Sequence, residues 1–308
     1  MMGENFGLDA ILDIKNEDYR HELESLFRSC AVNPINSDGD NALEKIHELS
    51  QLGVRQALYV ADKIDPEIMS AINNNAGIRL DNLLLVDDET KSEICNSTHL
   101  TDFNHVLSCN QKHVPHLQIM STVRKIREQK FFGVDKVVAY GAYVHNYVLS
   151  HSDQRQWFRD SLYEFVKGLS TVLNRPTDAY AQYAVEVQEE LLMNSIWDAN
   201  PKLKDVDRRI PVALPPHDTV QVEWSFDGTH LAIGVRDPFG TFEANVINKY
   251  LKFLFARDKK TMIRMRQEGA GAGLGLFMVL ERLSSLIINV APGKTTEVVA
   301  LRKTKVSI

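Results

Sequence analysis

Short apolar runs alternate with longer amphipathic stretches over residues 1–125 of the chain. The apolar runs are short and aliphatic, which predicts β-strands at 10–14, 57–61, 83–86 and 105–108. The stretches between and after them carry apolar residues at helical spacing, which predicts helices at 17–30, 40–49, 66–73 and 114–129. Strands and helices that alternate in this way form a parallel sheet covered on both faces. This part of the chain is therefore predicted to be an α/β domain.

The pattern changes in the second half of the chain. Helices are predicted at 153–173, 177–199, 243–257 and 274–286. Two hairpins are predicted as well, with strands at 220–226 and 230–235, and at 286–290 and 297–301. Asp227-Gly228 joins the first pair of strands, and this dipeptide is typical of tight β-turns. This order predicts an α+β sandwich, with helices packed on one face of a mixed or antiparallel sheet.

These two patterns divide the chain into two domains, 1–125 and 153–308. Between them, the aromatic and glycine-containing stretch 131–147 has the character of a junction. We therefore assign 126–152 to a linker. The length of 308 residues is sufficient for two ordinary domains.

Composition restricts the partners and the compartment. With 44% hydrophobic and 25% charged residues, the chain is typical of a globular protein. A formal net charge of -6 argues against a general nucleic-acid binder, because such proteins need a basic surface to neutralise phosphates. No apolar run reaches the roughly 18 residues that span a bilayer, and no signal-peptide pattern opens the chain. The odd cysteines, Cys30, Cys95 and Cys109, lack CxxC spacing. We expect a cytoplasmic protein that binds neither membrane nor nucleic acid.

The glycine cluster at 269–276, GAGAGLGL, is the first candidate for chemistry. Glycines let the backbone approach a phosphate closely, and a helix that begins there offers free N–H groups. The dinucleotide-binding GxGxxG pattern fails in every register, because Leu274, Leu276 and Met278 occupy the third glycine position. The Walker A pattern fails too, since Ile288 stands where its first glycine belongs.

The remaining pattern resembles the second glycine box of the GHKL ATPases, the fold shared by histidine kinases, Hsp90 and the anti-sigma serine kinases. It comprises Gly271, Gly273, Leu274, Gly275 and Leu276. Upstream, Glu190-Leu-Leu-Met-Asn194 resembles the N box of that family. The resemblance implies that Asn194 helps to hold a Mg²⁺ ion on the triphosphate. Glu190 lies one helical turn earlier on the same face, where it is placed to act as a general base.

Two further segments resemble the boxes that contact adenine. Asp237-Pro238-Phe239-Gly240 resembles the first glycine box, whose aspartate accepts a hydrogen bond from the adenine amino group. The segment 293–298 resembles the closing segment, which implies that Thr296 lines the adenine pocket. The first box departs from DxGxG, because Phe239 and Thr241 replace its glycines and Gly240 stands between them. The loop beside the nucleotide must therefore take another shape. Together these resemblances imply ATP and Mg²⁺ as cofactors.

The histidines argue against a conventional histidine kinase. None of the 10 lies in the sequence context of a phosphoacceptor histidine. The spacing of Glu190 and Asn194 and the preceding helix look more like the anti-sigma-factor serine kinases. The resemblance implies a protein partner, namely a sigma factor, an antagonist or another signalling protein. The helix at 153–173 is a candidate surface for homodimerisation, although it carries no sustained heptad.

Residues 1–125 look somewhat like a response-regulator receiver domain. Asp13 ends the first predicted strand, Asp62 follows the strand at 57–61, and Lys112 follows the last strand. Asp62 is the candidate phosphoacceptor, and the alternative is that it caps the helix that begins near Pro66. We favour a degenerate receiver that serves as a docking module.

The sequence thus predicts a bacterial signalling regulator that binds ATP, and more specifically a Mg-ATP-dependent protein serine/threonine kinase or partner-switching protein. Two alternatives stay open. One is a non-catalytic module in which ATP binding changes the shape offered to a partner. The other is a divergent histidine-kinase relative that works with a separate phosphotransfer protein.

Overall fold

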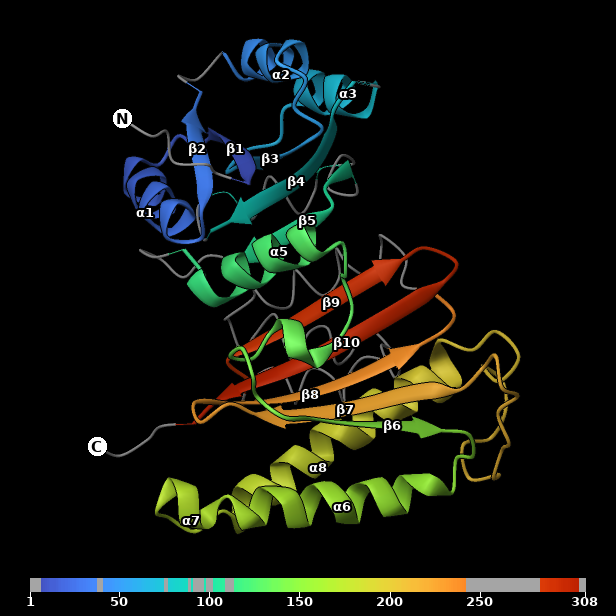
Figure 1. The fold of residues 1–308 in the computed structure, drawn as a ribbon. Helices are drawn as coiled ribbons and strands as arrows, with labels where there is room; N and C mark the ends of the chain where they lie inside the picture. The colour runs from blue at the N-terminus through green and yellow to red at the C-terminus, as the bar shows by residue number, and fades with distance from the viewer. Residues whose placement is uncertain are drawn as a thin grey trace. The chain divides into compact units, whose positions relative to one another are not determined.

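The computed structural model divides the chain into two compact units, Met1–Lys130 and Phe131–Ile308 (Figure 1). The residues that the structure describes are 7–37, 41–74, 77–87, 90, 97, 102–108, 114–241 and 283–304. No helix among these residues is long and apolar enough to cross a membrane. Each unit is built around one sheet of its own.

The first unit contains a parallel sheet of five strands in the order β2-β1-β3-β4-β5. Its strands are β1 (Leu8–Asp13), β2 (Val32–Asn36), β3 (Gln56–Ala61), β4 (Arg79–Val86) and β5 (His105–Ser108). The described helices are α1 (Glu17–Ser29), α2 (Ala42–Gln51), α3 (Pro66–Asn74) and α5 (His116–Glu128). Consecutive residues of β3 and β4 are buried, which requires both faces of the sheet to be covered. The α/β prediction for this part is confirmed.

The pattern of apolar runs did not predict β2. This strand has the sequence VNPIN, in which a proline and two asparagines disfavour a strand. It lies at the edge of the sheet, where a residue that donates no hydrogen bond is tolerated. The strand order 2-1-3-4-5 is that of flavodoxin-like doubly wound folds.

The second unit contains an antiparallel sheet of five strands in the order β6-β7-β8-β10-β9. Its strands are β6 (Val144–Leu149), β7 (Val220–Phe226), β8 (His230–Asp237), β9 (Ser285–Ala291) and β10 (Thr295–Lys303). Helices α6 (Gln154–Gly168), α7 (Ser170–Leu173) and α8 (Asp178–Met193) lie on one face of this sheet (Figure 1). The sequence left a mixed or an antiparallel sheet open, and the described strands are all antiparallel.

Side chains from the helix layer and the sheet meet in one apolar core. Leu162 and Val166 of α6 and Leu191 of α8 pack there with Trp224 and Ile233 of the sheet, and all five are buried. The Asp227-Gly228 hairpin and the β9–β10 hairpin occur where the sequence predicts them. The helices predicted at 243–257 and 274–286 fall wholly or almost wholly outside the described residues.

The boundary between the units differs from the predicted linker 126–152. Residues 126–130 belong to the first unit, and the rest belongs to the second. Strand β6 pairs with β7 along its whole length, and a 3-10 turn forms at Val134–Lys136. Aromatic and polar residues hid β6 from the apolar pattern, because only its Leu149 is fully buried.

Candidate functional site

Asp237 and Thr296 face each other across two strands of the second sheet. Asp237 ends β8, and Thr296 is its direct partner in β10. Leu231, Ile233 and Val235 of β8 all enter the core beneath the helices. Because side chains alternate along a strand, Asp237 lies on that same face. Both residues are buried, so two polar side chains from separate boxes of the sequence meet at the edge of an apolar core.

The environment of Asp237 opposes its charge. Burial raises the pKa of this carboxyl group to about 6, although backbone hydrogen bonds from Phe239, Gly240 and Thr296 act in the other direction. The amide of Phe239 donates to Oδ1 at 3.0 Å. Asp237 is thus a buried carboxylate at neutral pH, able to accept a hydrogen bond from a ligand.

The hydroxyl of Thr296 is buried and has no hydrogen-bond partner among the described residues. Most buried polar groups in proteins are satisfied, so such an orphan calls for an explanation. A ligand that bonds to Thr296 would supply one. The hydroxyl lies on the strand position opposite the buried carboxyl group of Asp237, so the pair offers both a donor and acceptors for a hydrogen bond.

Gly240 explains how the loop after β8 differs from a DxGxG box. Its φ is 60°, and a Cβ there would lie 2.7 Å from the Gly293 nitrogen and 2.5 Å from the Lys294 nitrogen. Only glycine permits this approach to the β9–β10 turn. The Gly293 amide donates to the Gly240 carbonyl at 3.1 Å. Thr241, in one of the expected glycine places, donates from its hydroxyl to the Ala199 carbonyl at 3.1 Å. The loop therefore joins the hairpin to the end of the helical layer.

Glu190 and Asn194 lie at the end of α8, one helical turn apart. The Asn194 amide donates to the Glu190 carbonyl, and both residues are half-buried. From Asn194 the helix widens into a π-helical turn, Asn194–Asp198, closed by the bond from the Ala199 amide to the Asn194 carbonyl at 2.8 Å. Such turns are rare and are often found at functional sites, because they redirect the side chains that follow.

The neighbouring acid, Glu189, has a structural partner. Arg155 of α6 forms an ion pair with it at 2.9 Å and lies over the ring of Trp197 at 5.0 Å. This contact ties α6 to the end of α8. Glu189 therefore serves the packing of the two helices, a role that the sequence alone could not assign to it.

Helix α8 and the π-helical turn both pack on β8. The two groups, Glu190 with Asn194 and Asp237 with Thr296, therefore lie on adjoining elements of one unit. Among the described residues, no cluster of three or more His, Cys, Asp or Glu side chains could hold a metal ion. The second glycine box lies outside the described residues: Gly271, Gly273, Leu274, Gly275 and Leu276.

In the first unit, Asp62 follows the end of β3 at the carboxyl edge of the sheet. Its Oδ2 accepts hydrogen bonds from the amides of Lys15 at 2.8 Å and Asn16 at 3.0 Å, while its Oδ1 is buried without a partner among the described residues. The alternative role as a helix cap belongs instead to Asp65, which accepts from the Glu67 amide at 3.0 Å. Lys112 lies outside the described residues.

Asp13, the last residue of β1, is also buried at this edge. Its carboxylate accepts from the Tyr59 hydroxyl at 2.8 Å and lies 3.4 Å from the Lys63 ammonium. Burial, with the charge of Asp13 next, raises the pKa of Tyr59 above its ordinary value, so the hydroxyl stays a donor. The structure thus brings Asp13 and Asp62 to one edge, where Asp13 has the Tyr59 hydroxyl and the Lys63 ammonium as partners and Asp62 accepts two backbone amides through Oδ2.

Neither a protein-family model nor a curated protein matches the sequence. Among solved structures, the chain is similar to a chain of the SiaB-SiaC complex from Pseudomonas aeruginosa. The identity is 14%, the TM-score is 0.36, and the match covers 60% of this chain and 97% of that chain. At this TM-score the likeness does not establish a shared fold.

Proposed function

We propose that the second unit binds ATP in the manner of a GHKL domain and that the protein is a signalling regulator. One observation carries this proposal: Asp237 and Thr296, from separate sequence boxes, are direct cross-strand partners, and the buried Thr296 hydroxyl has no described partner. An adenine base presents an amino group and ring nitrogens to such a pair. Gly240 shapes the loop beside them.

Asn194 and Glu190 would lie at the triphosphate of the bound ATP, as metal ligand and general base respectively. The amide oxygen of Asn194 is a hard ligand of the kind that Mg²⁺ prefers, and it lies at the start of the π-helical turn. When bound, Mg²⁺ would neutralise charge on the phosphates. Glu190 would accept the proton of the attacking hydroxyl. The backbone of Gly271, Gly273 and Gly275, with Leu274 and Leu276 beside them, would cradle the phosphates.

The nucleophile would lie on another protein. None of the 10 histidines lies in the sequence context of a phosphoacceptor, and the Glu190–Asn194 spacing resembles that of the anti-sigma serine kinases. By that resemblance, the partner would be a sigma factor that the domain binds, or an antagonist or other signalling protein that it phosphorylates on serine or threonine. The altered first glycine box favours a second candidate, a non-catalytic module that ATP switches between two shapes, because Thr241 ties this loop to the end of the helical layer.

The first unit would act as a receiver-like docking module. Its strand order and the buried acids at the carboxyl ends of β1 and β3 support a degenerate receiver. Asp62, the candidate phosphoacceptor, already accepts two backbone amides with one oxygen. This arrangement favours a structural role for Asp62 over phosphorylation.

Competition between ATP and GTP tests the adenine site. ATP and ADP should displace a fluorescent adenine nucleotide from the wild-type protein, whereas GTP should not, because guanine offers a carbonyl where adenine offers its amino group. We expect Asp237→Ala to weaken ATP by more than about tenfold, the usual effect of losing a hydrogen bond to a charged group. Equal displacement by GTP would contradict the assignment of Asp237.

A further inference from the structure

Residues 131–139, here called the strap, run across the face of the second sheet that the helices leave open. Gly133 donates its amide to Glu297 Oε1 at 2.6 Å, and Val134 donates to Glu223 Oε2 at 2.9 Å. The far oxygens of the two glutamates accept from Asn289 and Asn146, each at 2.8 Å. Glu297 is 1% exposed and Glu223 is 8% exposed, so the strap is held by two buried carboxylates.

The middle of the sheet is shaped to receive the strap. Gly234 of β8 lies directly opposite Glu223 of β7. A Cβ on Gly234 would lie 2.5 Å from a methyl carbon of Val134, whereas its next neighbours are at ordinary distances of 3.5 and 3.9 Å. Glycine at position 234 therefore leaves the space that the side chain of Val134 occupies.

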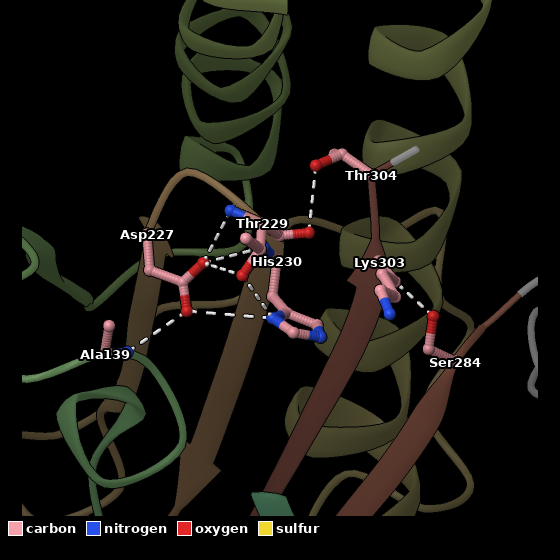
Figure 2. A network of polar contacts seen from close by, with 7 residues as sticks. All are labelled: Ala139, Asp227, Thr229, His230, Ser284, Lys303 and Thr304. Atoms are coloured by element: carbon pink, nitrogen blue, oxygen red, sulfur yellow. Dashed lines mark hydrogen bonds and ion pairs between the residues drawn. The ribbon is translucent and has the colours of Figure 1, made fainter. Parts of the chain in front are cut away.

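The other end of the strap is fixed at the first hairpin. The Ala139 amide donates to Asp227 Oδ2 at 3.1 Å, and Oδ1 of the same carboxylate accepts from Thr229 and His230 (Figure 2). Burial opposes the charge of Asp227, but these hydrogen bonds outweigh it and hold its pKa below the ordinary value. One end of the strap is thus bound by two carboxylates of the sheet, and the other by a carboxylate of the turn between β7 and β8.

The strap lies directly behind the proposed nucleotide site. Glu297, which holds Gly133, follows Thr296 in β10, and its cross-strand partner Arg236 precedes Asp237 in β8. The Arg236 guanidinium lies over the ring of Phe132 at 5.9 Å. Phe132 and Gly133 of the strap thus contact Arg236 and Glu297 on one face of the sheet. These two residues are the chain neighbours of Asp237 and Thr296, which lie on the opposite face.

We infer that the strap regulates the proposed nucleotide site by holding Asp237 and Thr296 in register from behind. The inference rests on the proposed function. Strap docking fixes β8 and β10 in the arrangement that pairs the two residues, so release of the strap weakens nucleotide binding. By reciprocity, bound nucleotide strengthens strap docking by the same factor.

Gly234→Ala tests the inference, since the added methyl group meets only Val134 at close distance. We expect this variant to bind Mg-ATP about tenfold more weakly, a typical coupling between sites. Hydrogen exchange at the amides of Gly133 and Val134 should accelerate. The double variant Gly234→Ala with Val134→Ala makes room for the methyl group and should restore both. Glu186→Gln, at an exposed position of α8, is the control.

A second variant keeps the test decisive if Gly234→Ala does not fold. Glu297→Gln has the same shape but replaces one acceptor oxygen by a donor, so one of the two N–H groups that face it loses its partner. Weaker nucleotide binding in either variant supports the inference. Unchanged affinity in both overturns it and leaves the proposed function intact. If the wild-type protein binds no nucleotide, the proposed function fails, and this inference fails with it.

Discussion

Asp237 is a carboxyl group whose pKa, about 6, lies above its ordinary value because burial disfavours its charge. The folded protein therefore binds this proton more tightly than the unfolded chain does. The contribution of Asp237 to stability is full below about pH 4 and is lost as the pH rises through about 6. We expect the wild-type protein to lose on the order of 2–3 kcal/mol over this window relative to Asp237→Asn.

Urea unfolding of both proteins between about pH 4 and pH 8 measures this difference. The asparagine can still accept the Phe239 amide, so the comparison isolates the charge. Parallel stability curves for the two proteins would show that Asp237 has an ordinary pKa. The pH dependence assigned to the site would then be wrong.

Thr296 offers a prediction in which stability and binding change in opposite directions. Thr296→Val keeps the shape of the side chain and removes a buried hydroxyl that has no described partner. We expect the unliganded protein to gain about 1 kcal/mol, because an unsatisfied buried polar group is removed. Nucleotide affinity should fall about fivefold to tenfold, as for loss of one hydrogen bond. Unfolding and binding measured on the same preparation check both, and unchanged affinity would exclude Thr296 from the site.

At the scale of elements, two adjacent glutamates at the end of α8 are assigned different roles. Glu189 pairs with Arg155, whereas Glu190 is the candidate base. Glu190→Gln should reduce phosphotransfer or ATP hydrolysis by at least about a hundredfold, because the amide cannot accept the proton of the attacking group. Glu189→Gln should leave activity within a few-fold and lower the free energy of unfolding by about 1 kcal/mol.

Activity measured with a radiolabelled γ-phosphate, and urea unfolding of the same variants, distinguish the two roles. If Glu190→Gln keeps its activity while Glu189→Gln loses it, the assignments are reversed. If ATP binds but neither the wild-type protein nor the variants turn it over, the non-catalytic alternative is favoured.

Strands and helices with a regular apolar pattern could be predicted from the sequence. Strands that lack this pattern, and side chains buried by a segment distant in the sequence, could not. The core strands β1, β3, β7 and β8 have strong apolar patterns, and Asp227-Gly228 is a dipeptide typical of tight β-turns. Strand β2 contains Pro34, and β6 has few buried residues, so both lack that pattern. Glu223 alternates with apolar neighbours, which predicts a solvent-facing side chain. The strap covers it, and no local pattern reports a covering segment.

The candidate site was predictable in part. Resemblance to family boxes predicts Asp237 and Thr296 as site residues, and the register of β8 with β10 makes them cross-strand partners. The π-helical turn at Asn194 and the shape of the loop at Gly240 could not be predicted, because both depend on contacts with distant segments. The role of Asp65 as the cap of α3 was missed for a simpler reason. Two acids precede Pro66, and only the structure shows which one faces the helix amides.

At the scale of the whole molecule, two compact units share one chain, and nucleotide should stabilise only the second. At a ligand concentration of about 100 times Kd, binding adds about 2.7 kcal/mol to the stability of the unit that contains the site. Hydrogen exchange of the intact protein should therefore slow in β8 and β10 on addition of Mg-ATP. Amides of β1 and β3 should exchange at the same rates with and without nucleotide. Protection confined to β1 and β3 would place the nucleotide site in the first unit and contradict the account.

The most direct test of ATP binding is calorimetric titration of the intact protein with ATP, with and without Mg²⁺, on the wild type and Asn194→Ala. We predict that the wild type binds in the micromolar range, roughly -8 kcal/mol, and that binding is tighter with Mg²⁺. Asn194→Ala should lose the dependence on Mg²⁺, since it removes the proposed ligand. Absence of binding to the wild type at millimolar ATP would contradict the account, and the second unit would then be a scaffold for protein contacts without a nucleotide.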